Sequence, residues 1–261
     1  MGPFHVVGAA DWDCAFSPDD QERAAGALEG GQVLVFPSLA YSVSADGRRF
    51  LTPAVLHKSK NVSYDPATGR VGGSACTGAD AEALRRLMAG FGGRAQALLR
   101  RLLPAYRDGL RVGRTSLRPA EVRGRATSWR KDDTRLHVDS FPSQPTRGRR
   151  ILRVFSNVNP EGRPRRWRVG EPFAAVAGRF WPRLRRPLPG AGAVLRLVGA
   201  TKATRTHYDH YMLRLHDAMK ADADYQRSAG QVVHDFPAGS TWACFTDQVS
   251  HAALAGQHQF E

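Results

Sequence analysis

Two residues that could bind one metal ion together are His137 and Asp139, which are separated by a single residue. Side chains at positions i and i+2 point the same way on a β-strand, so both could reach one ion. The neighbours Leu136 and Val138 are apolar and alternate with them. This pattern predicts a strand that turns its apolar side chains to the core and its imidazole and carboxylate into a cavity.

A second His-x-Asp triplet, His207 to Asp209, has different surroundings. Large apolar and aromatic residues recur around it at helical spacing, namely Tyr208, Met212, Leu215 and Met219. On a helix, side chains at i and i+2 diverge by about 200° and cannot chelate one ion. We therefore expect the first triplet, and not the second, to bind metal.

A site of this type needs a third ligand, and His251 is the best candidate. It follows a strand-like segment at 241–245, and the small residues 252–253 after it leave room around an ion. His234 and His258 are weaker rivals. Two imidazoles and one carboxylate form the facial triad that binds non-haem Fe(II) and leaves other coordination positions open.

The elements that must position these ligands are mostly short strands. Apolar and β-branched runs between turn signals predict strands at 32–37, 136–139, 151–158, 193–198, 231–236 and 240–245. A helix is expected over 80–103, and the stretch 162–189, rich in Arg and Pro, is expected to be an exposed loop or a short insertion. The sequence thus predicts a β-rich α+β fold with a jelly-roll or barrel-like core and flanking helices.

The composition is that of a globular protein with a strong positive charge. Its 261 residues are 42% hydrophobic and contain no apolar run long enough to span a bilayer, which excludes a disordered chain and a transmembrane protein. The 38 Lys and Arg against 24 Asp and Glu give a net charge of +14. All but five of the basic residues are Arg, which suits a polyanionic partner such as nucleic acid, anionic lipid or a phosphorylated sugar.

Three longer segments, residues 58–66, 128–139 and 208–220, resemble the Kdo hydroxylases. These are bacterial Fe(II)/2-oxoglutarate-dependent dioxygenases that act on the sugar 3-deoxy-D-manno-oct-2-ulosonic acid (Kdo) of the lipopolysaccharide inner core. The resemblance runs from Val33 to the end of the chain.

The resemblance implies a single dioxygenase domain over 1–261. Residues 117–261 would form a double-stranded β-helix core (jelly-roll, cupin-like) with an insertion around 160–228, and residues 1–116 would add N-terminal strands and helices that support this core. His137, Asp139 and His251 would hold Fe(II). The implied reaction uses O2 and 2-oxoglutarate, releases succinate and CO2, and hydroxylates C3 of the Kdo sugar.

The co-substrate needs a cation that binds its distal carboxylate. Many members of the wider superfamily use an Arg ten or more residues after the second His, but none of residues 252–261 is Arg or Lys. The anchor therefore lies elsewhere, or beyond the residues of this chain. Arg153 is our candidate, because it shares a strand face with Asn157 and an Arg–carboxylate pair can be bidentate. Arg150 competes if the strand register shifts by one.

The acceptor is also anionic, since Kdo carries a carboxylate and lipid A carries phosphates. Arg130 and Lys131 precede the metal-binding pair and could hold the sugar acid, and His210 and His216 could line the same entrance. The expected partner is Kdo-containing lipid A or a lipopolysaccharide precursor, with peripheral contact to an anionic membrane surface. The start of the chain shows no signal peptide, so we expect a cytoplasmic protein at the inner face of the inner membrane.

Two other functional classes compete with this reading. A metal-binding β-helix protein that does not use 2-oxoglutarate would lack an anchoring Arg in its cavity. A basic nucleic-acid-binding protein would show binding with steep salt dependence. The sequence contains no helix-turn-helix, RRM or zinc-finger pattern, so no nucleic acid is expected as a partner.

Overall fold

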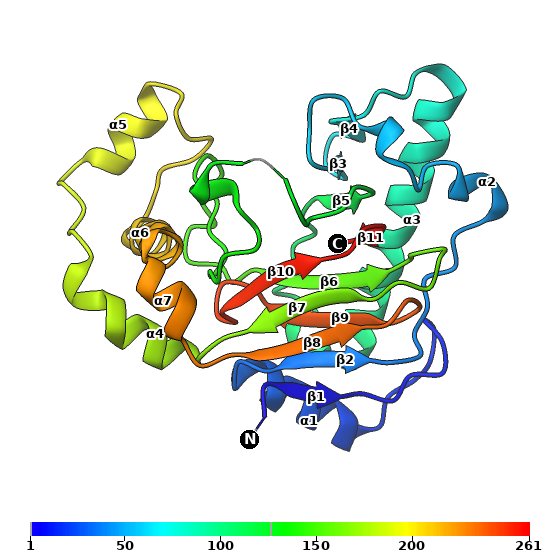
Figure 1. Ribbon diagram of the computed structural model, residues 1–261, viewed down its shortest axis with the longest axis horizontal. Helices are drawn as coiled ribbons and strands as arrows, with labels where there is room; N and C mark the ends of the chain where they lie inside the picture. The colour runs from blue at the N-terminus through cyan, green and yellow to red at the C-terminus, as the bar shows by residue number, and fades with distance from the viewer. Residues whose placement is uncertain (1, 126) are drawn as a thin grey trace.

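The computed structural model describes residues 2–125 and 127–261, which form two β-sheets with helices around them (Figure 1). The strands are β1 (Phe4–Val6), β2 (Val33–Phe36), β3 (Val62–Asp65), β4 (Arg70–Gly72), β5 (Thr115–Arg118), β6 (Leu152–Asn157), β7 (Arg165–Val169), β8 (Val232–Phe236), β9 (Thr241–Phe245), β10 (His251–Ala255) and β11 (Gln259–Phe260). The large sheet has the order β1-β2-β9-β6-β11-β5-β3-β4, and the small sheet has the order β10-β7-β8. Only the β1–β2 pair is parallel among the strand pairs of the described residues.

The helices are α1 (Pro18–Glu29), α2 (Ala45–Arg48), α3 (Gly78–Leu102), α4 (Phe173–Phe180), α5 (Ala191–Leu197), α6 (His207–Ala221) and α7 (Ala223–Ser228). Four single turns of 3-10 helix complete the fold, at Pro53–Val55, Pro104–Tyr106, Trp129–Lys131 and Trp181–Arg183. No helix within the described ranges is long and apolar enough to cross a membrane.

The two sheets pack face to face. Successive side chains of a strand point to opposite faces of its sheet, so every second residue lies between the sheets. On β9, Trp242 and Cys244 join a buried cluster with Trp167 of β7 and Phe236 of β8. Ala243 and Phe245 of the same strand point to the opposite face and pack with the helices. A period of two thus places one core between the sheets and a second core behind the large sheet.

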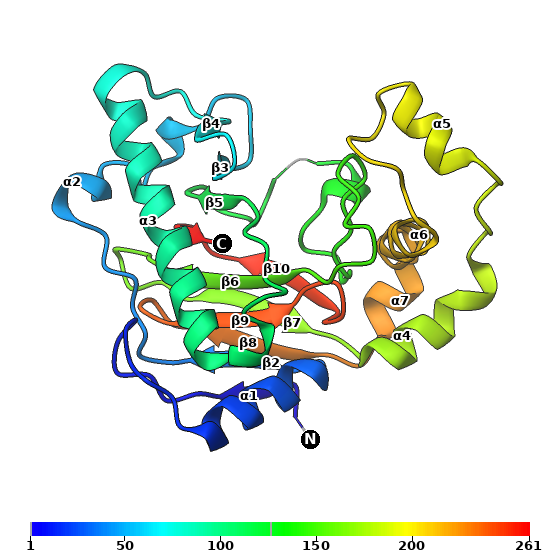
Figure 2. The same cartoon turned by 180° about the vertical axis from the view of Figure 1, so that it is seen from behind.

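The second core is covered by α1 and α3, which lie in front of the large sheet when it is seen from behind (Figure 2). α3 contributes side chains at helical spacing, namely Leu84, Met88, Phe91, Ala95, Leu98 and Leu102. The helix predicted for 80–103 is therefore confirmed. The strands predicted around 32–37, 151–158, 231–236 and 240–245 are also confirmed, as β2, β6, β8 and β9.

Two predictions about the segment between β6 and α6 are wrong. Residues 193–198 are not a strand, because α5 runs from Ala191 to Leu197 and leaves Val194 and Leu197 exposed instead of pairing with a sheet edge. Residues 162–189 are not a simple loop, because they include β7 and α4. The sequence of β7 does not show the hydrophobic pattern typical of a strand, because one of its three buried residues is Arg165.

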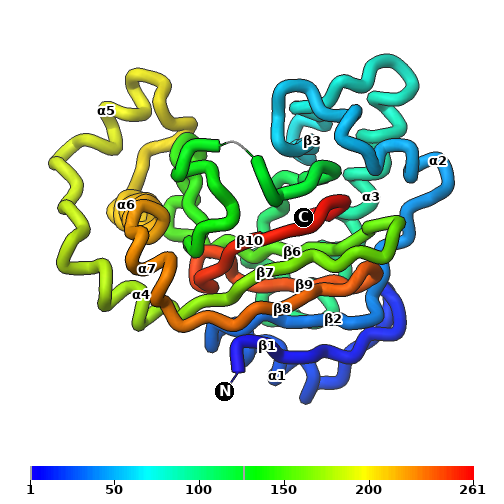
Figure 3. Tube along the Cα trace, viewed as in Figure 1, coloured from blue at the N-terminus to red at the C-terminus, as the bar shows by residue number. Residues whose placement is uncertain are grey.

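Strands of the large sheet come from both parts of the predicted division of the chain. β7 lies inside the insertion predicted around 160–228, yet it is the central strand of the small sheet, so that insertion is interrupted by a core strand. Residues 1–116 contribute β1 to β4 and the start of β5 to the large sheet, together with α1 to α3. The chain trace ends beside β6, where β11 pairs with both β5 and β6 (Figure 3).

We predict that Phe91→Ala destabilises the fold by about 3–5 kcal/mol, the usual cost of removing a buried phenyl ring. Phe91 is buried, stacks on Phe260 at 5.1 Å and meets Tyr41 edge-on at 5.1 Å between ring centroids. Urea unfolding measures the change. Arg100→Ala, an exposed position on the same helix, is the control and should change the free energy of unfolding by no more than about 0.5 kcal/mol. Equal effects of the two substitutions would contradict this packing.

Candidate metal centre

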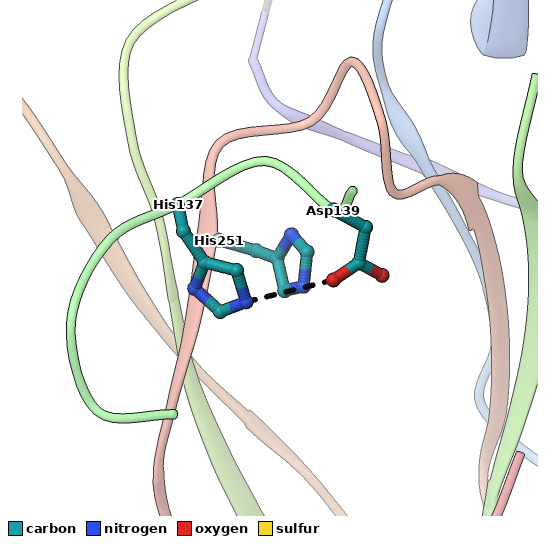
Figure 4. A group of neighbouring side chains, drawn as sticks. All are labelled: His137, Asp139 and His251. Carbon is teal, nitrogen blue, oxygen red and sulfur yellow. Dashed lines mark ion pairs between the residues drawn. The ribbon is translucent and has the colours of Figure 1, made fainter. Parts of the chain in front are cut away.

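The structure brings together the three side chains that the sequence singles out, His137, Asp139 and His251 (Figure 4). One potential ligand atom of each lies within 4.8 Å of the others. Nε2 of His137 is 3.6 Å from Oδ1 of Asp139, and the two imidazole centroids are 4.7 Å apart. The arrangement presents two ring nitrogens and one carboxylate oxygen to a common point.

A short antiparallel bridge positions the two imidazoles. The backbone N–H of His137 donates to the carbonyl of His251 at 3.0 Å, and the N–H of His251 donates back at 2.9 Å. Residues 136–139 form only this isolated bridge and not the regular strand that we predict for them. The alternation is nevertheless present, since Leu136 and Val138 are buried among α4, α6 and α7 while His137 faces the cavity.

Hydrogen bonds fix which nitrogen of each ring faces the centre. Nδ1 of His137 donates to the carbonyl of Arg135, and Nδ1 of His251 donates to the carbonyl of Val249, each at 2.8 Å. This tautomer leaves the Nε2 lone pair of each ring free for a metal. Burial lowers the pKa of His137 to about 4 and also lowers the pKa of His251. Both rings are therefore neutral near pH 7, the form that a metal requires.

The third side chain is held as a carboxylate. Burial by itself would raise the pKa of Asp139, but the guanidinium of Arg153 outweighs it and holds that pKa well below its usual range. Nε of Arg153 lies 3.1 Å from Oδ2 of Asp139. Oδ1, the oxygen beside His137, remains available as a ligand atom.

The second triplet has a structural role, as its helical spacing predicts. His207 is exposed at the start of α6, and Asp209 belongs to the N-terminal capping box of that helix with Thr206. Asp209 also accepts hydrogen bonds from Thr146 and from the backbone of Arg147. The two other imidazole rivals, His234 and His258, do not line the cavity that contains the triad.

The triad lies in a cavity of about 270 Å³ that is strongly cationic. Seven Lys and Arg side chains line it against three carboxylates: Lys60, Arg118, Arg130, Lys131, Arg153, Arg165 and Lys220 against Asp133, Asp139 and Glu261. Phe155, Trp167 and Ala253 add apolar surface, and Trp167 stacks on His251 with ring centroids 5.1 Å apart. The cavity is suited to an anionic organic molecule beside the metal centre.

Opposite charges alternate along one wall of this cavity. Nearest N–O distances between successive partners range from 2.8 to 3.3 Å. The order is Lys60, Asp133, Arg118, Glu261, Arg153 and Asp139. The wall therefore leads from the Lys60 side of the cavity to the metal centre through paired charges, and each carboxylate between them contacts two cations.

Arg165 stands apart from this network. Its side chain is buried, and one guanidinium nitrogen donates to the carbonyl of Gly256. Its Nε is buried without a hydrogen-bond partner among the described residues. Burial lowers the pKa of Arg165 to about 9, because no carboxylate pairs with it as Glu261 pairs with Arg118. Arg165 and Lys220 are thus the two buried cations of the cavity that have no carboxylate partner among the described residues.

The residues predicted for the co-substrate separate into two groups. Arg153 lies in the cavity, whereas Asn157 does not, since its amide donates to the carbonyls of Arg163 and Phe236. Arg150 also lies outside the cavity; it pairs with Glu29 at 2.7 Å and stacks over Phe245. The sequence pattern places Arg153 and Asn157 on one strand face, but only the end of that face nearest the metal centre reaches the cavity.

The residues predicted for the acceptor separate in the same way. Arg130, Lys131 and His216 line the cavity. His210 does not, because its ring points to the carbonyl of Arg185 at 2.9 Å. The sequence analysis misses Lys60, Arg118, Arg165, Lys220 and Glu261. Only Arg165 carries a usable signal, its period-two alternation with Trp167 and Val169; the others depend on contacts between distant segments.

We predict that His137→Ala or Asp139→Ala abolishes binding of Fe(II) or Co(II), because each removes one of three converging ligand atoms. Titration calorimetry with Co(II) on the metal-free protein measures the stoichiometry. His207→Ala, which removes the imidazole of the second triplet, should keep one metal ion per chain. Full metal binding by the His137 variant, or its loss in the His207 variant, would reject the assignment.

Comparisons with known proteins agree with this site. The family described as 3-deoxy-D-manno-oct-2-ulosonic acid (Kdo) hydroxylase matches residues 11–261. A search of the curated proteins finds no match. Among solved structures, the chain is similar to the Kdo hydroxylase KdoO, a non-heme Fe(II) alphaketoglutarate dependent dioxygenase, in complex with cobalt(II), at 47% identity and a TM-score of 0.96.

Two further structures of KdoO hold alphaketoglutarate with Fe(III), at 47% identity, and succinate with Fe(III), at 46% identity; both have a TM-score of 0.95. Each of the three alignments covers 99% of this chain and 87% of the other. The resemblance predicted from residues 58–66, 128–139 and 208–220 is confirmed. The chain belongs to the Kdo hydroxylase family.

Proposed function

We propose that this protein is an Fe(II)/2-oxoglutarate-dependent dioxygenase that hydroxylates C3 of a Kdo sugar. The observation that carries the proposal is the convergence of His137, Asp139 and His251 in a cationic cavity, in a chain that belongs to the Kdo hydroxylase family. The alternative is a metal-binding β-helix protein that does not use 2-oxoglutarate, and such a protein would lack an anchoring Arg in its cavity. This cavity contains four Arg side chains.

The residues present fit the iron and the co-substrate. Two neutral imidazoles and one ionised carboxylate are the donor set of non-haem Fe(II) sites. Nε of Arg165 and Nε1 of Trp167 belong to residues of the cavity wall and have no hydrogen-bond partner among the described residues, so they could donate to an anion. When bound, the iron and 2-oxoglutarate would supply the oxidising chemistry, in which O2 is consumed, succinate and CO2 are released and a C–H bond becomes C–OH.

The chain's own residues would orient the reactants and keep the centre ordered. The carbonyls of Arg135 and Val249 hold the two imidazoles in one tautomer. Arg153 keeps Asp139 ionised as its ion-pair partner, with Nε 3.1 Å from Oδ2. Phe155 and Trp167 add apolar surface to the cavity wall, and Trp167 stacks on the ring of His251. Such a preformed, partly apolar site favours reaction at one positioned C–H bond.

We propose that Arg153 binds the distal carboxylate of 2-oxoglutarate. It adjoins the metal centre through Asp139 and also pairs with Glu261 at 3.0 Å. A dianion in the cavity would share this guanidinium with Glu261. Arg165 is the competing anchor, since it is a buried guanidinium in the cavity wall whose Nε has no hydrogen-bond partner among the described residues. Arg150 and Asn157, which lie outside the cavity, have no comparable support.

We propose that the carboxylate of the Kdo acceptor binds Arg130, Lys131 and Lys220. Lys220 is buried in the cavity wall, and its Nζ donates to the carbonyl of Arg130 at 3.0 Å. Burial lowers the pKa of Lys220, so an anion in contact would stabilise its charged form. Arg130 is more exposed and pairs with Asp217 at 3.3 Å.

The finer assignments follow the same proposal. The two facing sheets would be the two faces of a double-stranded β-helix within one domain over 1–261. The acceptor would be Kdo linked to lipid A or to another lipopolysaccharide precursor, reached by peripheral contact with the inner membrane. What supports the membrane contact is the excess of 38 Lys and Arg over 24 Asp and Glu.

We predict that the iron-loaded protein releases succinate from 2-oxoglutarate faster when Kdo-containing lipid A is present. The protein is loaded with Fe(II) without oxygen, air is admitted, and succinate is measured by chromatography. The acceptor should gain the mass of one oxygen atom, at C3 by NMR. Iron-loaded protein that gives no acceptor product would refute the proposed reaction.

A crossed pair of variants tests the two anion sites. Arg153→Ala should raise KM for 2-oxoglutarate about tenfold or more, because a hydrogen bond to a charged group is worth about 1.5–3 kcal/mol. Lys220→Met should raise KM for the acceptor and leave that for 2-oxoglutarate unchanged. Arg150→Ala is the control and should change neither KM. If Arg165→Ala, and not Arg153→Ala, raises KM for 2-oxoglutarate, the anchor is Arg165.

A further inference from the structure

The segment that joins α4 to α6 exposes an unusual amount of apolar surface. We call residues 181–205 the α5 lobe, which lies at the outer edge of the molecule beyond α6 (Figure 1). It contains five of the eleven exposed large hydrophobic side chains among the described residues: Trp181 at 58%, Leu188 at 77%, Val194 at 57%, Leu197 at 86% and Val198 at 67% relative exposure. Such a concentration in one surface segment indicates a binding surface.

The apolar side chains of the lobe share one helix face. Val194, Leu197 and Val198 stand at positions i, i+3 and i+4 of α5 and its C-terminal cap, so they form a stripe. No residue of α5 is buried. Leu188 lies just before the helix, in the turn where the N–H of Ala191 bonds to its carbonyl. The stripe therefore faces solvent and contributes nothing to the protein core.

The sequence around this stripe is basic, and two of its cations, Arg179 and Arg183, pair with Glu171 and Asp222. Between Glu171 and Asp209 the sequence has no acidic residue, and it has seven basic ones: Arg179, Arg183, Arg185, Arg186, Arg196, Lys202 and Arg205. Arg185, Arg186 and Arg196 are exposed. An aliphatic stripe flanked by cations matches the interface of an anionic bilayer, where the acyl boundary takes the aliphatic groups and the headgroups take the cations. Single-stranded nucleic acid would call for several stacking aromatic rings, whereas the lobe exposes one, Trp181, which packs on Tyr211.

The α5 lobe is attached to the elements that form the cavity. At one end, the N–H of Lys202 donates to the carbonyl of Ser143 at 2.9 Å, and Arg205 donates to the carbonyl of Pro142, which lines the cavity. At the other end, Trp181 packs on Tyr211 of α6, with ring centroids 4.9 Å apart. α6 itself carries His216 and Lys220 of the cavity wall. A partner surface that binds to the lobe would thus lie next to the cavity.

We propose that the α5 lobe is a membrane-docking surface for an anionic bilayer. Leu188, Val194, Leu197 and Val198 enter the acyl boundary while the neighbouring Arg and Lys contact lipid phosphates. The proposal rests on the proposed function in one respect, because docking matters to catalysis only when the sugar acceptor is linked to a lipid. Residues 181–205 would thus make the membrane contact, whereas the net charge of the whole chain points to no particular segment.

Vesicle binding tests the surface without any catalysis. The iron-free protein is mixed with vesicles of phosphatidylcholine alone, or of phosphatidylcholine and phosphatidylglycerol in equal parts, and the bound fraction is measured by sedimentation. The anionic vesicles should bind it, less so at high salt, and L197S/V198S should weaken binding at least tenfold. V232S/V233S, at exposed positions on β8, is the matched control and should bind normally. Equal binding of both variants, or equal binding to both vesicle types, would overturn the proposal.

Activity with two acceptors separates this proposal from the function itself. L197S/V198S should keep kcat/KM for a Kdo oligosaccharide without acyl chains and lose at least tenfold for Kdo-lipid A in anionic vesicles. Equal kcat/KM losses on both acceptors would overturn docking by the lobe. If neither acceptor is hydroxylated but the vesicle result holds, the proposed function fails and the docking surface stands. Loss of binding to RNA or DNA in L197S/V198S, with vesicle binding intact, would assign the lobe to nucleic acid and overturn the proposal.

Discussion

The reciprocal backbone hydrogen bonds between His137 and His251 are the contact on which the metal centre depends. They join two segments that are far apart in the sequence, and they set the imidazoles side by side. Both strand-like segments are anchored by burial of their other neighbours, Leu136 and Val138 on one side and Ala252 on the other. The ligand geometry is thus a product of backbone pairing and core packing, and the side-chain hydrogen bonds at Nδ1 only select the ring nitrogen.

The second constraint is electrostatic. A buried cation is costly unless a partner compensates for it, and this cavity holds seven cations. Alternation of charge from Lys60 to Asp139 compensates three of them, Lys60, Arg118 and Arg153, with Asp133 and Glu261 each shared by two cations. Arg165 and Lys220 are both buried without a carboxylate partner among the described residues, which leaves a positive potential for an anionic ligand to satisfy. The protein thereby keeps a cationic cavity without leaving every charge unpaired.

Sequence reasoning succeeds here where the chemistry follows local spacing. The alternation at 136–139 and the helical period around His207 separate the two His-x-Asp triplets correctly, and the helical spacing over 80–103 identifies α3. It fails where a polar residue is buried or an apolar residue is exposed. β7 is concealed because Arg165 takes an inward position normally held by an apolar residue, and α5 imitates a strand because its exposed Val and Leu suit either period. Arg118, Lys220 and Glu261 could not be found, since only long-range pairing brings them to the cavity.

The two residues of β11 and the one that follows serve different parts of the molecule. Phe260 stacks on Phe91 in the core behind the large sheet, while its neighbours Gln259 and Glu261 face the cavity. Helix packing and ligand recognition consequently share one stretch of backbone. A change in the packing of α3 against the large sheet would shift Glu261 relative to Arg118 and Arg153. Substitutions in this core would therefore change the affinity of the cavity for its ligand without altering any residue that lines the cavity.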